Sequence, residues 1–355
     1  MNNLKRKEVL DMAIRKICNL TLLLFVLLLC WTALSIAERK KPKVILKMAS
    51  NAPKDIGVEV YIRKQVSPGV KRVSNGEVVI DWFHGGIMGD NRDWISKMQI
   101  DQLQGAALDG SGIHLACPEA YIFQLPFIFY DFNEVAYVKE KLRSRMDNSF
   151  QRNGYKMLML FDQSFDKIYS TKREPRTLEN LAKIKFAAYA GLVENEIIKA
   201  LGANPIPMNV PEIVSSTRAG ICNGLFSPAL WYAGSQLYTI AKHVTVSNIR
   251  YTPACMTVTM NAWNRISENH QKAIEDVMRN LEPGLDQNLK DSNANCHRAM
   301  VKYGMNEIKW TPDEVEVFKK KTRPVWDKLV GKVYTRDLLN EILEYLEEYR
   351  SKKAT

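Results

Sequence analysis

The sequence predicts a two-lobed α/β protein in which parallel strands are joined by crossover helices. Segments with strand and helix patterns alternate between Thr177 and Thr245, and such alternation is typical of parallel sheets. The chain after Ala37 is too long for a single minimal core and fits two lobes. A long helical pattern follows from Ser267 to about Gly304.

The alternating region also predicts where a ligand binds. KIKFA reads as a strand ending near Ala187, Gly191 to Leu201 as a helix closed by Gly202, and NGLFSP as a second buried strand. Ligands of parallel sheets bind beyond the carboxyl ends of the strands. We therefore expect the loops after Phe186, Met208 and Phe226 to meet at a binding cleft.

Residues 1–37 have the features of an export signal. A basic start is followed by the uncharged segment LTLLLFVLLLCW and by small residues at Ser35 and Ala37, which a signal peptidase reads. The apolar core is shorter than the ~20 residues of a typical membrane span. A cleaved signal peptide and a periplasmic location are expected, and an uncleaved anchor is the alternative.

The charge of the exported part does not favour nucleic-acid binding. The chain carries +11 and the first 37 residues contribute +3, from five basic and two acidic residues, which leaves +8. Basic residues alternate with acidic ones in stretches such as EKLRSRMD and EVEVFKKK, as on a solvated surface. We expect no nucleic-acid partner.

Cysteine usage leaves the redox state open. Cys117, Cys222, Cys255 and Cys296 follow the leader, without the CxxC or Cys/His spacing of a zinc site. No metal site is expected. An exported protein can form disulfides, but buried free thiols are an equal alternative.

The first half of the chain predicts further strands and helices in order. Strand patterns lie at 44–49, in EVVIDWF, in GAAL and at 157–161; helical patterns lie at 58–73, interrupted by Pro68-Gly69, at 91–102 and at 133–153. The extended segment QLPFIFYDF precedes the third helix, and DKIYS begins the second lobe.

The last third of the chain is predicted to be helical. Pro283 lies in the middle of the long pattern, so the segment is either one bent helix or two helices. Thr311 to Glu314 forms a capping box with proline at the first helical position. Further helices are expected at 311–329 and 335–349.

Enzyme chemistry receives little support from the motifs. The five histidines are far apart, Ser227 lacks a GxSxG context, and the loop GGIMGD has neither the dinucleotide-binding nor the P-loop pattern. We expect no cofactor and no nucleotide. His84, after a strand, and Asn51, in the loop after the first strand, are candidate cleft residues.

Several segments together resemble the periplasmic solute receptors of tripartite ATP-independent periplasmic (TRAP) transporters, the DctP-like group. These segments are LENLAKIK, ALGANPIPMNVPEI, AGICNGLFSP, SQLYTIAKHVT, WFHGGIMGDNRDW and LPFIFYDFNEV. The resemblance covers roughly the whole chain after the leader.

The resemblance implies a Venus-flytrap fold with a long helix spanning both lobes. We expect lobe I at residues 38–161 plus 249–283 and lobe II at 162–248 plus 284–355. A small organic acid would bind between the lobes, and integral-membrane subunits of an ion-driven transporter would receive it. A periplasmic enzyme and a ligand sensor for a signalling protein are the alternatives.

The resemblance also implies site residues. The family arginine that holds the ligand carboxylate corresponds to Lys185, which keeps the charge but not the planar fork. A second arginine of many relatives corresponds to Asp166, which would repel a dicarboxylate but can accept hydrogen bonds from a hydroxyl or an amine. The remaining expected cleft residues are Ser227, in place of an asparagine, Val210, in place of an aromatic residue, and Trp231, which can supply aromatic surface.

Overall fold

The computed structural model describes residues 41–354 except 53, 54 and 56. The predicted signal peptide and its cleavage site therefore lie outside the described residues. All the elements below lie in one compact unit, Val44–Thr355. Within the described ranges, no helix combines the length and the apolar character that a membrane span requires.

Ten strands of this unit form one mixed sheet. Its main path runs β2-β1-β3-β9-β4-β7-β5-β6, with β8 pairing to β4 and β10 pairing to β8. The strands are β1 (Val44–Ser50), β2 (Val78–Phe83), β3 (Gly105–Leu108), β4 (Tyr155–Ser170), β5 (Lys185–Ala188), β6 (Asn204–Pro207), β7 (Gly224–Ser227), β8 (His243–Thr245), β9 (Arg250–Thr259) and β10 (Asn306–Ile308).

Helices connect most of these strands. They are α2 (Val58–Tyr61), continued by the π-helical turn Ile62–Val66 and α3 (Ser67–Val73), α4 (Asn91–Gln99), α5 (Ile113–Ala116), α6 (Phe132–Arg152), α7 (Leu178–Ala182), α8 (Leu192–Ala200), α9 (Ile213–Arg218), α10 (Ala229–Gly234), α11 (Met260–Trp263), α12 (Glu268–Lys302), α13 (Pro312–Thr322), α14 (Pro324–Lys328) and α15 (Arg336–Ala354). Short 3₁₀ segments lie at Pro118–Gln124, Val210–Glu212 and Leu237–Thr239.

Two long antiparallel strands join the two parallel parts of the sheet. β1 pairs in parallel with β2 and β3, and β5 pairs in parallel with β6 and β7. Between these groups lie β4 and β9, whose register places Asp166 opposite Arg250. β4 is sixteen residues long: it pairs with β9 as far as Asp166, and its last four residues, from Lys167, pair with β7 and β8.

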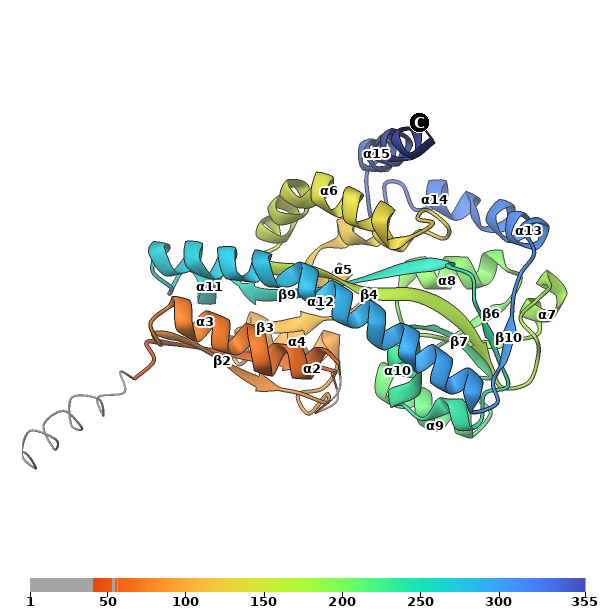
Figure 1. Cartoon of the computed structure of the whole chain (residues 1–355), viewed down its shortest axis with the longest axis horizontal. Helices are drawn as coiled ribbons and strands as arrows, with labels where there is room; N and C mark the ends of the chain where they lie inside the picture. The colour runs from red at the N-terminus through yellow and green to blue at the C-terminus, as the bar shows by residue number, and fades with distance from the viewer. Residues whose placement is uncertain (1–40, 53–54, 56, 355) are drawn as a thin grey trace, which may run out of the picture. The chain divides into compact units, whose positions relative to one another are not determined.

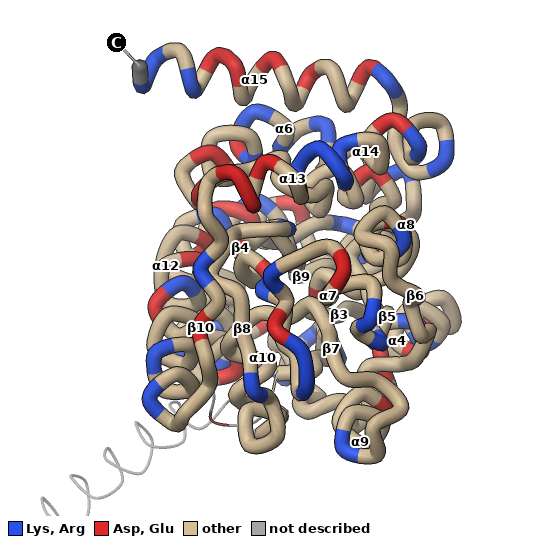
Figure 2. The backbone as a smooth tube through the Cα atoms, turned by 90° about the vertical axis from the view of Figure 1, so that its right-hand side faces the viewer, with Lys and Arg blue, Asp and Glu red and all other residues tan. Residues whose placement is uncertain are grey.

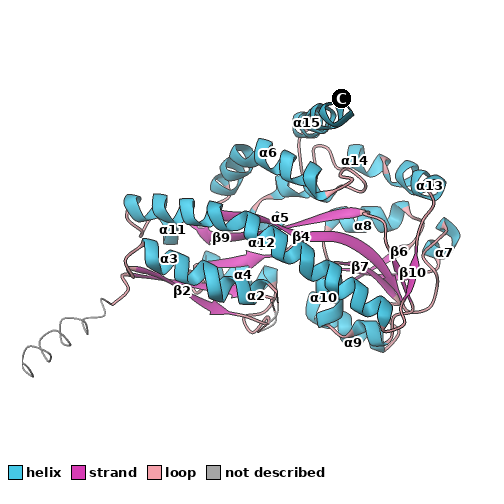
Figure 3. Ribbon diagram, in the orientation of Figure 1, coloured by secondary structure: helices cyan, strands magenta, loops and turns pink. Residues whose placement is uncertain are grey.

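Helices cover both faces of the sheet (Figures 1 and 3). One hydrophobic core includes residues of α4, α6, α8 and the C-terminal helices, and α15 packs on α6. A second core lies under α3 and α12, and a third lies around α9 and α10. Figure 1 shows α12 crossing from α3 to α10, and α12 packs along β4 between these points.

Local sequence signals explain most of the predicted elements. The long helix is confirmed as one element with Pro283 inside it, rather than two. Thr311 and Glu314 form the predicted capping box at the start of α13. The glycine after α8, Gly202, has a φ of +82°, which glycine adopts without steric cost.

Three predictions of element bounds differ from the structure. The strand expected at 157–161 is the first part of β4, which continues through DKIYS to Ser170 because both halves find pairing partners. The helix expected to end at Leu329 is divided into α13 and α14, with Pro324 opening the second. QLPFIFYDF is not the expected extended segment: a 3₁₀ helix ends at Gln124, and a turn follows in which Phe127 has a φ of +56°.

Candidate functional site

Three adjoining cavities lie at the carboxyl ends of β3, β5, β6 and β7. The apolar cavity has a volume of about 210 Å³, the small cavity about 20 Å³ and the polar cavity about 280 Å³. The small cavity shares Asp109, Gln163, Pro228 and Trp231 with the apolar cavity. It shares Ser111, Tyr189 and Val210 with the polar cavity. The predicted convergence of the loops after β5, β6 and β7 is thereby confirmed.

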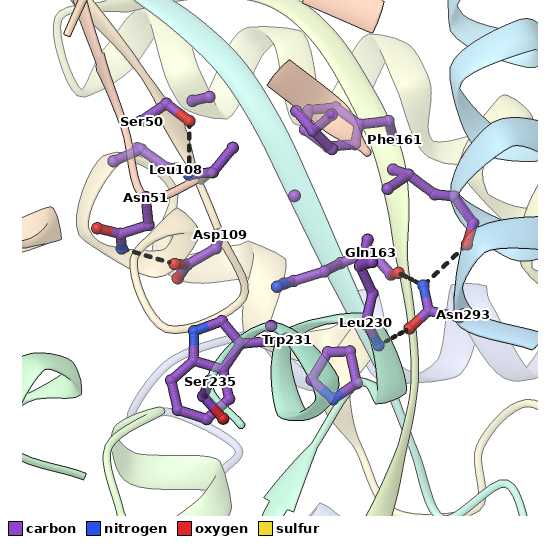
Figure 4. Close-up of a pocket in the computed structure, with 17 residues that line it drawn as sticks. Ser50, Asn51, Leu108, Asp109, Phe161, Gln163, Leu230, Trp231, Ser235 and Asn293 are labelled. Atoms are coloured by element: carbon purple, nitrogen blue, oxygen red, sulfur yellow. Dashed lines mark hydrogen bonds between the residues drawn. The ribbon is translucent and has the colours of Figure 1, made fainter. Parts of the chain in front are cut away.

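The apolar cavity is lined by residues from β1, β3, β4, β9, α10 and α12. Figure 4 shows Asn51, Leu108 and Asp109 on one side, and Phe161, Gln163, Leu230 and Asn293 on the other. Its lining consists of Ser50, Asn51, Ala52, Val58, Ala107, Leu108, Asp109, Phe161, Gln163, Pro228, Leu230, Trp231, Gly234, Ser235, Ala254, Leu289 and Asn293. Among these described residues there is no lysine, arginine or histidine.

Most polar groups of the apolar cavity already have partners within the protein. The Asn293 side chain donates to the backbone oxygens of Gln163 and Leu289 and accepts from the Leu230 N–H. Asn51 Nδ2 donates to Asp109 Oδ2 over 3.1 Å. Gln163 accepts the Gly110 N–H through Oε1, and Figure 4 shows the rest of its side chain reaching toward Asp109. Few polar groups therefore remain for a ligand here.

A buried arginine lies against the small cavity. Arg250 opens β9 and is 1 % exposed, while Asp166 on β4 and Glu194 on α8 are 0 % exposed. The guanidinium Nε donates to Asp166 Oδ2 over 2.8 Å, and Nη2 donates to the same oxygen and to Glu194 Oε1. Thr252 Oγ1 also donates to Asp166 Oδ2. The Asp166–Arg250–Glu194 triad thus joins three elements.

Two atoms of this triad have no hydrogen-bond partner among the described residues. They are Arg250 Nη1, a donor, and Asp166 Oδ1, an acceptor. A buried polar atom without a partner costs about 1–3 kcal/mol, so native structures rarely leave one unmatched. Both residues line the small cavity. Within the part of the chain that the structure describes, Arg250 Nη1 thus lacks an acceptor and Asp166 Oδ1 lacks a donor.

Burial and the neighbouring charges have opposing effects on the pKa values of Arg250 and Glu194, and both values are raised. Burial alone would lower the pKa of Arg250, but the carboxylates of Asp166 and Glu194 raise it, so the guanidinium remains charged. Burial raises the pKa of Glu194, although Arg250 and the backbone N–H groups of Tyr189 and Ala190 oppose the shift. The charged guanidinium therefore lies between the side chains of Asp166 and Glu194.

The polar cavity lies on the other side of the small cavity. It is lined by Asp90, Asn91 and Arg92 at the start of α4, by Ser111, Ala188, Tyr189, Gly191 and Asn195, and by Pro207, Met208, Asn209, Val210 and Glu212. Asn91 Nδ2 donates to Asp109 Oδ1 and to Ser111 Oγ, which fixes the loop after β3. The small cavity therefore lies between an apolar space and a polar one.

Four predicted site residues are brought together. Asn51 and Trp231 line the apolar cavity, Asp166 and Val210 line the small cavity, and Trp231 lines both. Trp231 stacks with Tyr189 at a centroid distance of 6.3 Å. The expected aromatic surface beyond β7 is therefore present at the cavities.

Three predicted site residues lie apart from these cavities. Lys185 is exposed at the beginning of β5, and its N–H donates to Asn223 Oδ1, whereas the cavities lie at the end of that strand. Ser227 is buried, and its hydroxyl donates to the Pro228 carbonyl. His84 stacks on Trp82, and burial lowers its pKa.

Sequence reasoning missed Arg250, Asp109, Gln163 and Glu194 as site residues. Asp109 had a local signal, because it opens the DGSG loop directly after a strand. Arg250 had none, because its role depends on the pairing of β9 with β4 across more than eighty residues. A single sequence does not reveal that register.

Figure 2 shows lysine and arginine interspersed with aspartate and glutamate along α13 and α15. The four cysteines of the described part of the chain are free, and Cys117, Cys222 and Cys255 are buried. In the same residues, no group of three or more His, Cys, Asp or Glu side chains is placed to hold a metal ion.

The fold and the cavities define a solute receptor of the periplasmic-binding-protein class. The family model for bacterial extracellular solute-binding protein family 7, DctP, matches residues 53–332, and the chain belongs to this family. Its members are TRAP solute receptors rather than enzymes, and the chain is one of them.

Individual relatives have low sequence identity to this chain but align with most of its length. A solute-binding protein of Chromohalobacter salexigens is 22 % identical over 74 % of this chain and 77 % of its own length. The C4-dicarboxylate-binding periplasmic protein DctP of Rhodobacter capsulatus is 22 % identical over 85 % of this chain and 90 % of its own length. The sugar acid binding protein DctPAm of Advenella mimigardefordensis was crystallised with galactonate. Its structure has a TM-score of 0.80 at 19 % identity and covers 87 % of this chain and 99 % of its own. This last likeness shows that the fold is the same.

Proposed function

We propose that this chain binds a small organic acid in the three adjoining cavities and delivers it to the integral-membrane subunits of an ion-driven TRAP transporter. The observation that supports an acid ligand most directly is the buried, unpartnered Nη1 of Arg250 beside the small cavity. A carboxylate oxygen accepts a charge-assisted hydrogen bond from such a group. The named ligands of relatives, C4-dicarboxylates and galactonate, are also carboxylates.

The binding mechanism that we propose is closure of two lobes. With lobe I at 38–161 plus 249–283 and lobe II at 162–248 plus 284–355, Asn51 and Asp109 belong to the first lobe and Val210 and Trp231 to the second. A ligand touching both sets gains contacts in the closed form that the open form lacks. Binding therefore shifts the population toward the closed form, which the membrane subunits would recognise.

A thermal-shift screen of organic acids, amino acids and neutral sugars tests the ligand class. A ligand at 100 times its dissociation constant adds about 2.7 kcal/mol to the free energy of unfolding. We expect carboxylates to raise the melting temperature and neutral sugars to leave it unchanged. Stabilisation by neutral sugars alone would contradict the proposal.

Lys185→Met tests whether Arg250 or Lys185 holds the ligand carboxylate. Lys185 is exposed, so the variant should fold, and we expect it to bind an identified acid as the native chain does. A loss of ten- to hundredfold in affinity would instead assign the anchor to Lys185, as the sequence alone suggests.

We also propose a periplasmic location that follows cleavage after Ala37. Mass spectrometry of the exported protein should give a chain beginning at Glu38. An intact Met1 would contradict cleavage and favour the uncleaved anchor.

A further inference from the structure

The structure points to a narrower ligand class: we propose that the ligand is an α-amino acid with an apolar side chain. The proposal rests on the proposed acid-binding function and adds two features, an ammonium group and an apolar body. Each feature comes from a different part of the cavities.

The first argument is the pairing of one unmatched donor with one unmatched acceptor. Arg250 and Asp166 bind each other through Asp166 Oδ2, which leaves Nη1 and Oδ1 without partners. Both side chains line the same small cavity. An α-amino carboxylate supplies the two complementary groups on adjacent carbons: its carboxylate accepts from Nη1 and its ammonium group donates to Oδ1. A simple carboxylic acid matches only the first.

The second argument is charge. Arg250 is already in contact with two buried carboxylates, those of Asp166 and Glu194, and Asp109 lines both the small and the apolar cavity. Another buried negative charge would have no cation of its own among the described residues lining these two cavities. A zwitterion adds no net charge, so its carboxylate and its ammonium group are both balanced locally. A dicarboxylate that placed its second charge in the apolar cavity would leave that charge unpaired.

The third argument is the neighbouring apolar cavity. Its volume of about 210 Å³ is bounded by large apolar side chains, among them Phe161, Leu230, Trp231 and Leu289. Its asparagine and serine groups are largely engaged within the protein. The hydroxyl groups of a sugar acid would lose water there without finding partners, whereas an aliphatic or aromatic side chain loses nothing.

Matched ligand sets test this inference on the protein purified after full-length expression. The first set is phenylalanine, 3-phenylpropanoate, which lacks the amine, and 2-phenylethylamine, which lacks the carboxylate. The second set is leucine, 4-methylpentanoate, which lacks the amine, and 3-methylbutylamine, which lacks the carboxylate. Succinate and galactonate complete the panel. By calorimetry, at least one of the two amino acids should bind at least tenfold more tightly than its truncated counterparts and than either polar acid.

The outcomes separate this inference from the organic-acid function. If 3-phenylpropanoate, succinate or galactonate binds as tightly as the amino acids, the inference is overturned and the acid-receptor function stands. If only the amines bind, both are overturned. If neither amino acid binds, the inference is overturned whatever the acids do.

Asp166→Asn adds a second measurement. The amide removes the negative charge facing the ammonium group, so the preference for an amino acid over its deaminated analogue should fall by about tenfold or more. An unchanged preference in the folded variant would contradict the assignment of Asp166. Should the variant not fold, the ligand sets alone decide.

Discussion

At the scale of single residues, the character of the site depends on the cross-strand pair of Asp166 and Arg250. Both side chains are essentially inaccessible to water, and their ion pair is extended by Glu194 and Thr252. Taking these charges out of water is costly, so each depends on its partners. The pair therefore links β4 to β9 and also supplies charged side chains to the lining of the small cavity.

Removing the arginine should destabilise the fold. Arg250→Met leaves Asp166 and Glu194 buried without a cation, and breaking such a pair typically costs about 3–5 kcal/mol. Urea unfolding should show this decrease in the free energy of unfolding. The double variant Arg250→Met, Asp166→Leu should recover part of it, because one unpaired carboxylate is gone. Equal stability of native and Arg250→Met chains would contradict the described triad.

His114 should contribute to acid sensitivity. Burial lowers its pKa to about 4, with Arg92 adding to the effect, whereas an unfolded histidine titrates near 6.5. Between these values the unfolded chain binds more protons, so stability falls as the pH drops from about 6.5 to 4. The largest possible loss is about 3 kcal/mol, at 1.36 kcal/mol per pKa unit.

His114→Phe should remove this contribution while keeping a ring stacked on Tyr121. The measurement is the free energy of unfolding at several pH values between 4 and 7. The variant should show a flatter profile in this range, and a profile parallel to that of the native chain would argue against a buried neutral histidine.

At the scale of elements, the start of α8 packs against Tyr121 of the 3₁₀ segment Pro118–Gln124. Gly191 precedes the helix with φ +86° and ψ −150°, a conformation nearly restricted to glycine. A Cβ at this position would lie 2.2 Å from the Tyr121 hydroxyl oxygen, which accepts the Leu192 N–H. The loop therefore approaches Tyr121 as closely as a backbone without a side chain permits.

Gly191→Ala should disturb this approach. Strain of about 1–3 kcal/mol is expected from the backbone, and the contact with Tyr121 adds to it. Gly154→Ala is a comparison variant, because Gly154 has the same φ of +86° but no atom within 4 Å of an added Cβ. Thermal unfolding should show a larger loss for Gly191→Ala, and equal losses would mean that Tyr121 does not constrain the loop.

Local signals made most elements predictable, and non-local pairing hid much of the site. The capping box of α13 and the helical pattern around Pro283 lie within short windows, so both were found. The position of Arg250 opposite Asp166 depends on the register of β9 on β4, which no short window contains. The strand containing Lys185 was predicted correctly. Lys185, however, is the first residue of β5, and the cavities lie beyond the last residue of that strand.

At the scale of the whole molecule, β4, β9 and α12 are the elements that run between the two groups of strands. A hinge motion within these elements would need changes at only a few backbone positions. An identified ligand at saturation should therefore reduce the radius of gyration in small-angle scattering. An unchanged profile would favour a rigid cleft or a receptor that is closed without ligand.

The central claim is that the ligand occupies the cavity beside α10, and Gly234 offers the most direct test. Gly234 lines the apolar cavity, and no atom lies within 4 Å of a Cβ added there. Gly234→Trp should place a large ring at the cavity wall without disturbing the core, whereas Gly234→Ala adds only a methyl group. Calorimetric titration with a ligand that the screen identifies should give native affinity for Gly234→Ala and at least tenfold weaker binding for Gly234→Trp, with both variants folded. Native affinity for Gly234→Trp would contradict the claim, because the ligand would then bind elsewhere.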